Sequence, residues 1–157
     1  MWTIVESNPS DDLRSNQTLN KTMLVTPIYT AILGFLFVAL SVRTLLLRRQ
    51  LGVALGDGEQ PILTRAVRVH SNFAEYVPLS LLLISFLETQ TGKSLWIHVL
   101  CSALLIGRII HALGVSKVEE EFRYRVTGMA FTLSAIISAS IGLILNYALH
   151  VYAYFYA

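Results

Sequence analysis

The residues best suited to chemistry lie in one short stretch, RAVRVHSNFAEYVP, from Arg65 to Pro78. At about 100° per residue, its polar side chains fall within an arc of about 100° on one face of a helix. They are Arg65, Arg68, Asn72, Glu75 and Tyr76. This stripe of two guanidinium groups, an amide, a carboxylate and a phenol is the first candidate for a binding surface.

The composition decides what kind of protein must position this stripe. Of 157 residues, 54% are hydrophobic and 14% are charged, whereas about 25% of residues are charged in an ordinary soluble domain. So apolar a chain is neither a soluble domain nor disordered. The net charge of +2 is too small to indicate a nucleic-acid partner.

Long apolar stretches predict transmembrane helices, since a bilayer core about 30 Å thick needs roughly 20 apolar residues per helix. The sequence predicts four spans, at about residues 25–47, 67–88, 95–115 and 126–150. The expected fold is all-α, an integral membrane antiparallel four-helix bundle over residues 23–157, in contact with the lipid bilayer. Residues 1–22 form a polar N-terminal extension.

Lysine and arginine set the predicted orientation, because these residues are retained on the cytoplasmic side of a membrane. The loops after the first and third spans share one side, which carries Arg43, Arg48, Arg49, Arg65, Arg68, Lys117, Arg123 and Arg125. The other side carries Arg14, Lys21 and Lys93. Both basic loops are therefore expected in the cytoplasm, and both termini outside.

Glu75 lies about 15 Å along the helix from Arg65 and so below the membrane surface. A charge at mid-membrane costs roughly 2.5–3.5 kcal/mol and usually has a partner, for which Arg68 and Arg108 are the candidates. These charges either hold helices together or belong to a ligand site. The surplus of arginines favours an anionic ligand that supplies its own carboxylates.

The remaining titratable side chains predict packing rather than chemistry. His70 falls on roughly the opposite side of the helix from the polar stripe, which favours a hydrogen bond to another helix over a general base. Cys101 lies mid-span and favours a packing role. His98 and His111 do not form a metal-binding pattern, and no metal is expected.

The motif RAVRVHSNFAEYVP, followed by LLIGRIIHALG and FRYRVTGM, resembles the MAPEG superfamily, the membrane-associated proteins in eicosanoid and glutathione metabolism. VALGDGEQPILTRAVRVHSNFAEYVPL and SLWIHVLCSALLIGRIIHALG are similar to its bacterial inner-membrane branch. The resemblance covers about Val25 to the C-terminus. It implies a homotrimer of four-helix bundles in the bacterial inner membrane, with glutathione bound between neighbouring subunits near the cytoplasmic side.

The resemblance also implies which residues would contact glutathione. Helix 2 would supply Arg68, Asn72, Glu75 and Tyr76, and helix 3 would supply Arg108 and His111. From the end of helix 1, Arg48 fits best, with Arg43 and Arg49 as alternatives. The arginine that activates the glutathione thiol most resembles Arg125, with Arg123 as the competitor.

The expected chemistry follows from the thiol, whose thiolate form is the nucleophile and is favoured by a nearby guanidinium. The leading hypothesis is a glutathione transferase, with peroxidase as a second candidate activity and glutathione as co-substrate for small hydrophobic electrophiles that enter from the lipid. Val115 and Met129 stand where several eicosanoid enzymes carry tyrosines, so eicosanoid synthesis is not supported. The alternative is a non-catalytic lipid-binding or scaffold protein in which the polar stripe stabilises the trimer.

Overall fold

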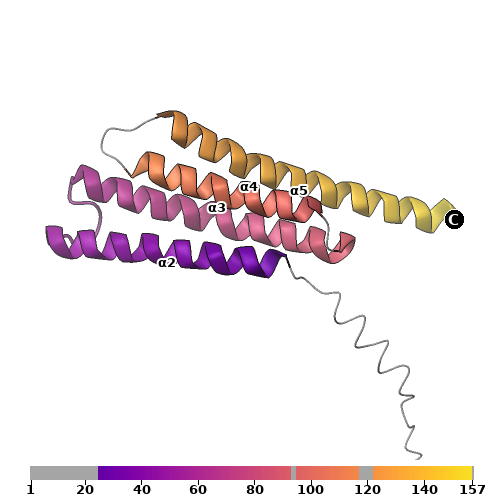
Figure 1. Ribbon diagram of the computed structural model, residues 1–157, viewed down its shortest axis with the longest axis horizontal. Helices are drawn as coiled ribbons and strands as arrows, with labels where there is room; N and C mark the ends of the chain where they lie inside the picture. The colour runs from indigo at the N-terminus through magenta and orange to yellow at the C-terminus, as the bar shows by residue number, and fades with distance from the viewer. Residues whose placement is uncertain (1–24, 93–94, 117–121, 157) are drawn as a thin grey trace, which may run out of the picture.

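The computed structural model describes residues 25–92, 95–116 and 122–156. It contains four antiparallel helices (Figure 1): α2 (Thr26–Leu51), α3 (Pro61–Thr91), α4 (Leu95–Val115) and α5 (Phe122–Tyr156). The described residues contain no strand, which confirms the predicted all-α four-helix bundle. The predicted extension, residues 1–22, lies outside the described residues, as do Lys93 and Lys117.

Three helices, α2, α4 and α5, are long and apolar enough to cross a membrane. The fourth, α3, has 31 residues, which is about 46 Å of helix. Its first half carries the charged part of the polar stripe, which lowers its hydropathy. The prediction that α3 is a further span stays a prediction.

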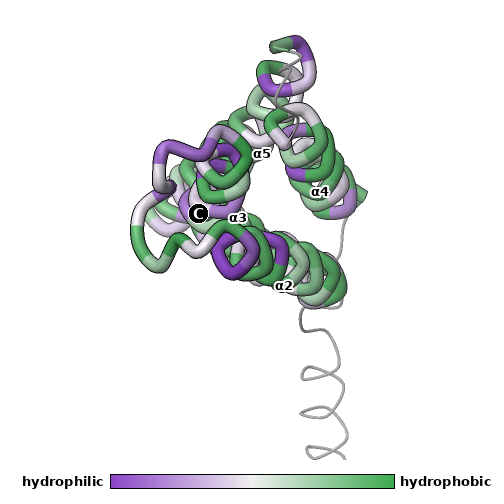
Figure 2. The backbone as a smooth tube through the Cα atoms, turned by 90° about the vertical axis from the view of Figure 1, so that its left-hand side faces the viewer, coloured by the Kyte–Doolittle hydropathy of each residue, from purple (hydrophilic) through white to green (hydrophobic). Residues whose placement is uncertain are grey.

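Much of the outside of the bundle is apolar. Figure 2, which looks along the bundle, shows hydrophobic residues on outward as well as inward faces of the helices. Leu33, Ile84 and Leu104 are buried between helices, whereas Phe35 and Ile144 are exposed. Such an outer surface suits lipid, since lipid tails replace water as its surroundings.

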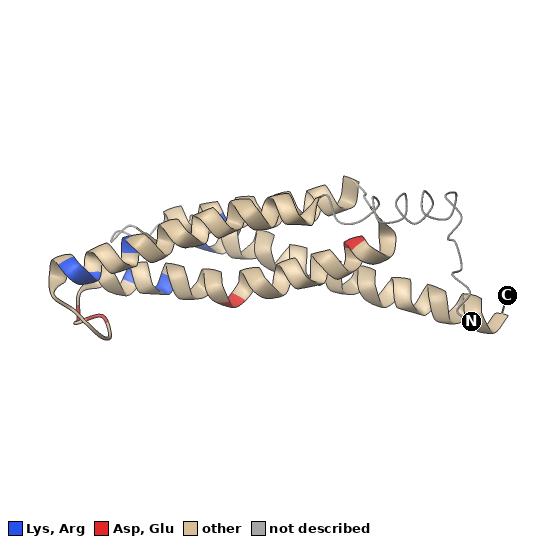
Figure 3. Ribbon diagram, turned by 90° about the horizontal axis from the view of Figure 1, so that it is seen from below, with Lys and Arg blue, Asp and Glu red and all other residues tan. Residues whose placement is uncertain are grey.

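Among the described residues, arginine gathers in the half of the bundle that contains the α2–α3 connection (Figure 3). This connection turns at Gly52, Gly56 and Gly58, all of which have positive φ, a conformation open to glycine without steric cost. Arg48, in the last turn of α2, donates hydrogen bonds to the Ala54 and Gly56 carbonyls at 3.4 and 2.7 Å. The Arg48 side chain thus ties the end of α2 to the connection that follows it.

Glycine sets the distance between α4 and α5. A Cβ added at Gly107 would lie 2.9 Å from the Gly128 carbonyl oxygen, and one at Gly128 would lie 2.6 Å from the His111 nitrogen. A Cβ at Gly114 would lie 2.6 Å from the Tyr124 Cβ. Small residues of this kind let helix backbones approach closely in membranes. The start of α5 is therefore held directly against the end of α4.

At the opposite end of the bundle, Glu88 on α3 closes the start of α2. The carboxylate of Glu88 is 1% exposed and accepts hydrogen bonds from the Val25 and Thr26 backbone N–H groups, each at 3.1 Å. Val25 offers no side-chain cap for α2. Glu88 therefore satisfies N–H groups that a helix start leaves without partners.

Candidate functional site

A pocket of about 610 Å³ lies against the basic half of α3 and is bordered by α4 and α5. Its wall on α3 comes from Pro61, Thr64, Arg65, Arg68, Ser71, Asn72 and Glu75. His111 and Val115 line it from α4, and Arg125 lines it from α5. Three arginines, one carboxylate and one histidine thus share one pocket.

The wall on α3 is the polar stripe that the helical period predicts. Arg68, Asn72 and Glu75 recur at intervals of three and four residues, which places them on one helix face. Thr64 and Ser71 also line the pocket and were not predicted from the sequence, although the same helical period, read for hydroxyl side chains, brings them near this face.

The site on α4 and α5 depends on the glycine contacts between these helices. Gly114 packs against Tyr124, the residue before Arg125, and His111 packs against Gly128. His111 is 6% exposed, whereas Arg125 is exposed. Arg125, and not Arg123, is among the lining residues. The close helix crossing therefore brings the first turn of α5 to the pocket.

Glu75 makes no ion pair with Arg68 or Arg108 within the parts of the chain described. Its side chain is exposed, as is that of Arg68, while Arg108 is directed elsewhere. The expectation that one of these arginines neutralises Glu75 inside the chain is therefore wrong. The carboxylate faces the pocket with its charge available to a ligand or to another subunit.

Arg108 is buried, with 1% of its surface exposed, and does not line the pocket. It donates to the Asn72 side-chain oxygen at 2.7 Å and to the Gly128 carbonyl at 3.5 Å, and it lies 5.8 Å from the centre of the Tyr76 ring. Its Nε has no hydrogen-bond partner in the described part of the chain. Arg108 thus acts on the pocket through Asn72, and Tyr76 supports Arg108 instead of lining the pocket.

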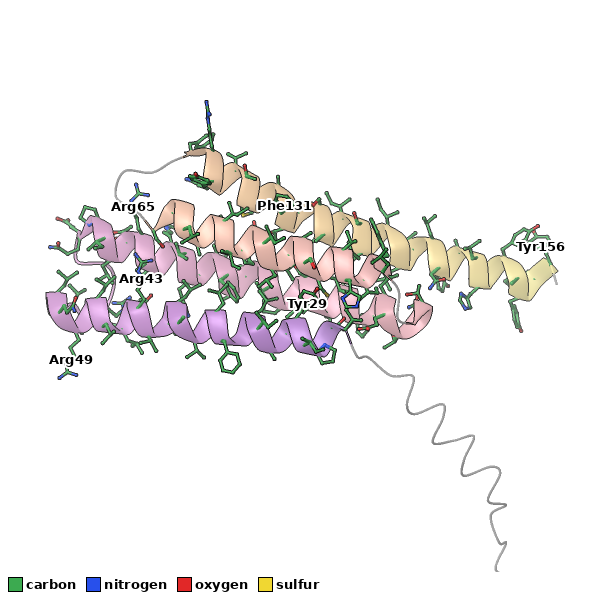
Figure 4. All side chains as sticks on the ribbon, in the orientation of Figure 1. Tyr29, Arg43, Arg49, Arg65, Phe131 and Tyr156 are labelled. Atoms are coloured by element: carbon green, nitrogen blue, oxygen red, sulfur yellow. The ribbon has the colours of Figure 1, made fainter. Side chains whose placement is uncertain are left out.

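The arginines at the end of α2 do not reach this pocket. Arg48 binds carbonyls of the α2–α3 connection, and Arg43 donates to the Ser116 side chain and to the Ser116 carbonyl beyond the end of α4. Arg49 is exposed and points away from the bundle, whereas Arg65 lies on α3 at the same end (Figure 4). A contribution of Arg48, Arg43 or Arg49 to a neighbouring subunit stays a prediction.

His70 plays the part that its position on the helix predicts. Its Nε2 lies 2.9 Å from the Ser41 hydroxyl on α2, and its ring stacks on Phe37 with centres 4.8 Å apart. Cys101 is free and buried, in agreement with a packing role. In residues 25–92, 95–116 and 122–156, no group of three His, Cys, Asp or Glu side chains could hold a metal ion.

Comparison with known proteins places this arrangement in a family. The model of the MAPEG family matches residues 26–145. The chain belongs to the MAPEG family. The match spans α2, α3, α4, α5 as far as residue 145, and every residue that lines the pocket. The site therefore lies within the part of the chain that is common to MAPEG proteins.

MAPEG relatives include the "Inner membrane protein YecN" of Escherichia coli strain K12 and of Escherichia coli O6:H1. Each is 32% identical over 114 residues, which cover 73% of this chain and 86% of the relative. Together with three apolar helices, these relatives make the chain a bacterial inner-membrane protein. It is thus a membrane protein of the glutathione and eicosanoid family.

Proposed function

We propose that this MAPEG protein binds glutathione in the pocket on α3 and transfers its thiolate to small lipophilic electrophiles. The observation that carries the proposal is the exposed, unpaired Glu75 carboxylate in a pocket lined also by Arg65, Arg68 and Arg125. The pocket volume of about 610 Å³ lies within the range of roughly 300–1,000 Å³ for small-molecule sites.

The charges of the pocket complement those of glutathione. The tripeptide carries two carboxylates and one ammonium group. Glu75 is placed to bind the ammonium, and Arg65 and Arg68 to bind carboxylates, for which guanidinium groups offer paired donors. Asn72, oriented by Arg108, supplies an amide between them.

Arg125 is assigned to the thiol. It lies in the first turn of α5, which begins at Phe122, so the positive end of the helix dipole adds to its own charge. Both favour the thiolate over the thiol. The thiolate sulfur then bonds to the electrophilic carbon of the co-substrate, and the leaving group departs with the electron pair of the bond that breaks.

A second reaction of the same thiolate is the reduction of a hydroperoxide. Two glutathione molecules are oxidised to the disulfide while the hydroperoxide is reduced to an alcohol and water. In both reactions the lipophilic co-substrate would enter from the bilayer. We further propose that the protein works as a homotrimer with its basic loops in the cytoplasm, so that a neighbouring subunit completes the pocket.

Glutathione binding to the detergent-solubilised protein, measured by isothermal titration calorimetry, tests the proposal. Wild type should bind saturably, and Arg68→Ala and Glu75→Gln should each weaken binding about tenfold or more, since a charge-assisted hydrogen bond contributes about 1.5–3 kcal/mol. Glu59→Gln is a matched control, because Glu59 is an exposed carboxylate outside the pocket.

The chemistry is tested separately with a chlorodinitrobenzene electrophile and thiolate absorbance. Arg125→Ala should retain glutathione but lose most of the bound thiolate and most of the conjugation rate. If Arg125→Ala forms as much bound thiolate as wild type, Arg125 does not activate the thiol. If wild type shows no saturable glutathione binding, the proposed transferase function is wrong and the lipid-binding or scaffold alternative is favoured.

A further inference from the structure

A second hollow surface lies on the other side of α3, between α3 and α2, and we call it the α2–α3 groove. It consists of two hollows of about 470 and 410 Å³ that share Phe37 as a wall. The groove uses residues of α3 such as Val67, His70 and Val77, which are not among those that line the glutathione pocket. Within one chain it is therefore a separate site.

Polarity changes along this groove. The hollow toward the α2–α3 connection is lined by Arg48, His70 and Ser41. The hollow beyond Phe37 is lined almost entirely by apolar groups, among them Leu33, Gly34 and Val77. A polar end followed by an apolar channel has the arrangement of a lipid headgroup followed by its acyl chain.

The distance from the headgroup end of the groove to its acyl hollow agrees with half of a membrane. Arg48, in the polar hollow, and Gly34, in the apolar hollow, are about 21 Å apart along α2 at 1.5 Å per residue. Half of a bilayer that is about 40–45 Å thick with its headgroups is about 20–22 Å. A lipid with its phosphate at the level of Arg48 would thus reach the bilayer centre at the level of Gly34.

The charge of the groove indicates an anionic headgroup. Arg48 is the one charged side chain among the residues that line the two hollows. Its two hydrogen bonds to the connection both come from the same terminal nitrogen. The other terminal nitrogen and Nε donate to no group in the described residues, and a guanidinium can offer these donors to a phosphate.

We propose that the α2–α3 groove binds one anionic phospholipid, with its phosphodiester at Arg48 and an acyl chain in the hollow lined by Gly34. Basic pockets between membrane helices are typical sites for anionic headgroups. This site goes beyond the proposed function and does not depend on glutathione binding.

The groove offers a variant that fills it without strain. A Cβ at Gly34 would meet no atom within 4 Å, so the side chain of Gly34→Leu can occupy the acyl hollow. Ala130→Leu is the matched control, because it adds bulk at an exposed position of α5 outside the groove. Arg48→Ala tests the headgroup contact.

Native mass spectrometry of delipidated protein, titrated with phosphatidylglycerol or phosphatidylcholine of the same acyl chains, measures the binding. Wild type and Ala130→Leu should retain one phosphatidylglycerol per chain, about tenfold more tightly than phosphatidylcholine, as expected for one charge-assisted contact. Gly34→Leu should lose both lipids, and Arg48→Ala should lose the preference.

Equal binding of the two lipids by wild type, or wild-type binding by both groove variants, would overturn the proposal. A second copy of the chain in the groove would also overturn it, and would appear as a change of oligomeric mass in Gly34→Leu without a change in bound lipid. None of these results depends on whether glutathione binds.

Discussion

The Arg108 guanidinium donates a 2.7 Å hydrogen bond to the Asn72 side-chain oxygen and so ties the buried interior of α4 to the pocket wall on α3. Arg108 has no carboxylate partner among the described residues, and Asn72 is its shortest contact. A charge this deep depends strongly on the few dipoles around it.

Asn72→Ala should therefore destabilise the bundle by about 1–3 kcal/mol, because it leaves a buried donor of Arg108 without its partner. Unfolding in sodium dodecyl sulfate, followed by circular dichroism, measures this loss. Asn146→Ala is the control, since Asn146 donates to Gln90 at 3.2 Å at an exposed position. Equal losses in the two variants would contradict the role given to Asn72.

Gly128→Ala should separate α4 from α5. The new Cβ would lie 2.6 Å from the His111 nitrogen and 2.7 Å from the Gly107 carbonyl oxygen, so the expected cost is about 1–3 kcal/mol from overpacking. Gly142→Ala meets only the Leu87 side chain at 3.2 Å, which can move, and should cost less. The same unfolding measurement compares them, and equal stability would show that the two helices are not held by this contact.

Glu88→Gln should weaken the start of α2. Glutamine keeps one acceptor oxygen but places an amide donor where the second oxygen accepts from Val25 or Thr26, so one N–H group loses its partner at about 1–3 kcal/mol. Hydrogen exchange at one of these two amides should become faster than in wild type. Glu59→Gln changes an exposed loop carboxylate and should leave exchange at α2 unchanged; slow exchange in Glu88→Gln would argue against the cap.

The α2–α3 connection gives a prediction for pH. The Thr64 hydroxyl donates to the Asp57 carboxylate at 2.8 Å and, with the Glu59 N–H, lowers the pKa of Asp57. A lowered pKa means that this contribution to stability is present above the pKa of the unfolded chain and is lost as pH falls through the pKa of the folded chain.

Thr64→Val removes the hydroxyl and should raise the pKa of Asp57 toward its ordinary value. Carbon-13 chemical shifts of the Asp57 carboxyl, recorded against pH in detergent, measure it. Thr91→Val removes a hydroxyl at the other end of α3 and should leave this titration in place. An unchanged titration in Thr64→Val would mean that other groups hold the pKa down.

Residues on a single helix face could be predicted from spacing alone. Arg68, Asn72 and Glu75 share the pocket wall, and His70 turns the other way to bond Ser41, because the helical period fixes both directions before any packing occurs.

Partners on different helices could not be predicted in this way. Arg108 selects Asn72 and Gly128 rather than Glu75 because the close approach at Gly107 fixes the rotation of α4. The role of Glu88 as a cap for α2 was not predicted, since a carboxylate near a helix end is typical of an exposed surface position. The absence of a capping side chain at Val25 was the available signal.

The close crossing of α4 and α5 also limits how this sequence can change over time. A side chain at Gly107 would meet the Gly128 carbonyl, and one at Gly128 would meet the Gly107 carbonyl. Main-chain atoms are the same whatever residue occupies a position, so no substitution at either glycine can make room for a change at the other. A substitution at one glycine thus cannot be compensated by a substitution at the other. The helix spacing that brings His111 and Arg125 to one pocket therefore requires glycine at both positions.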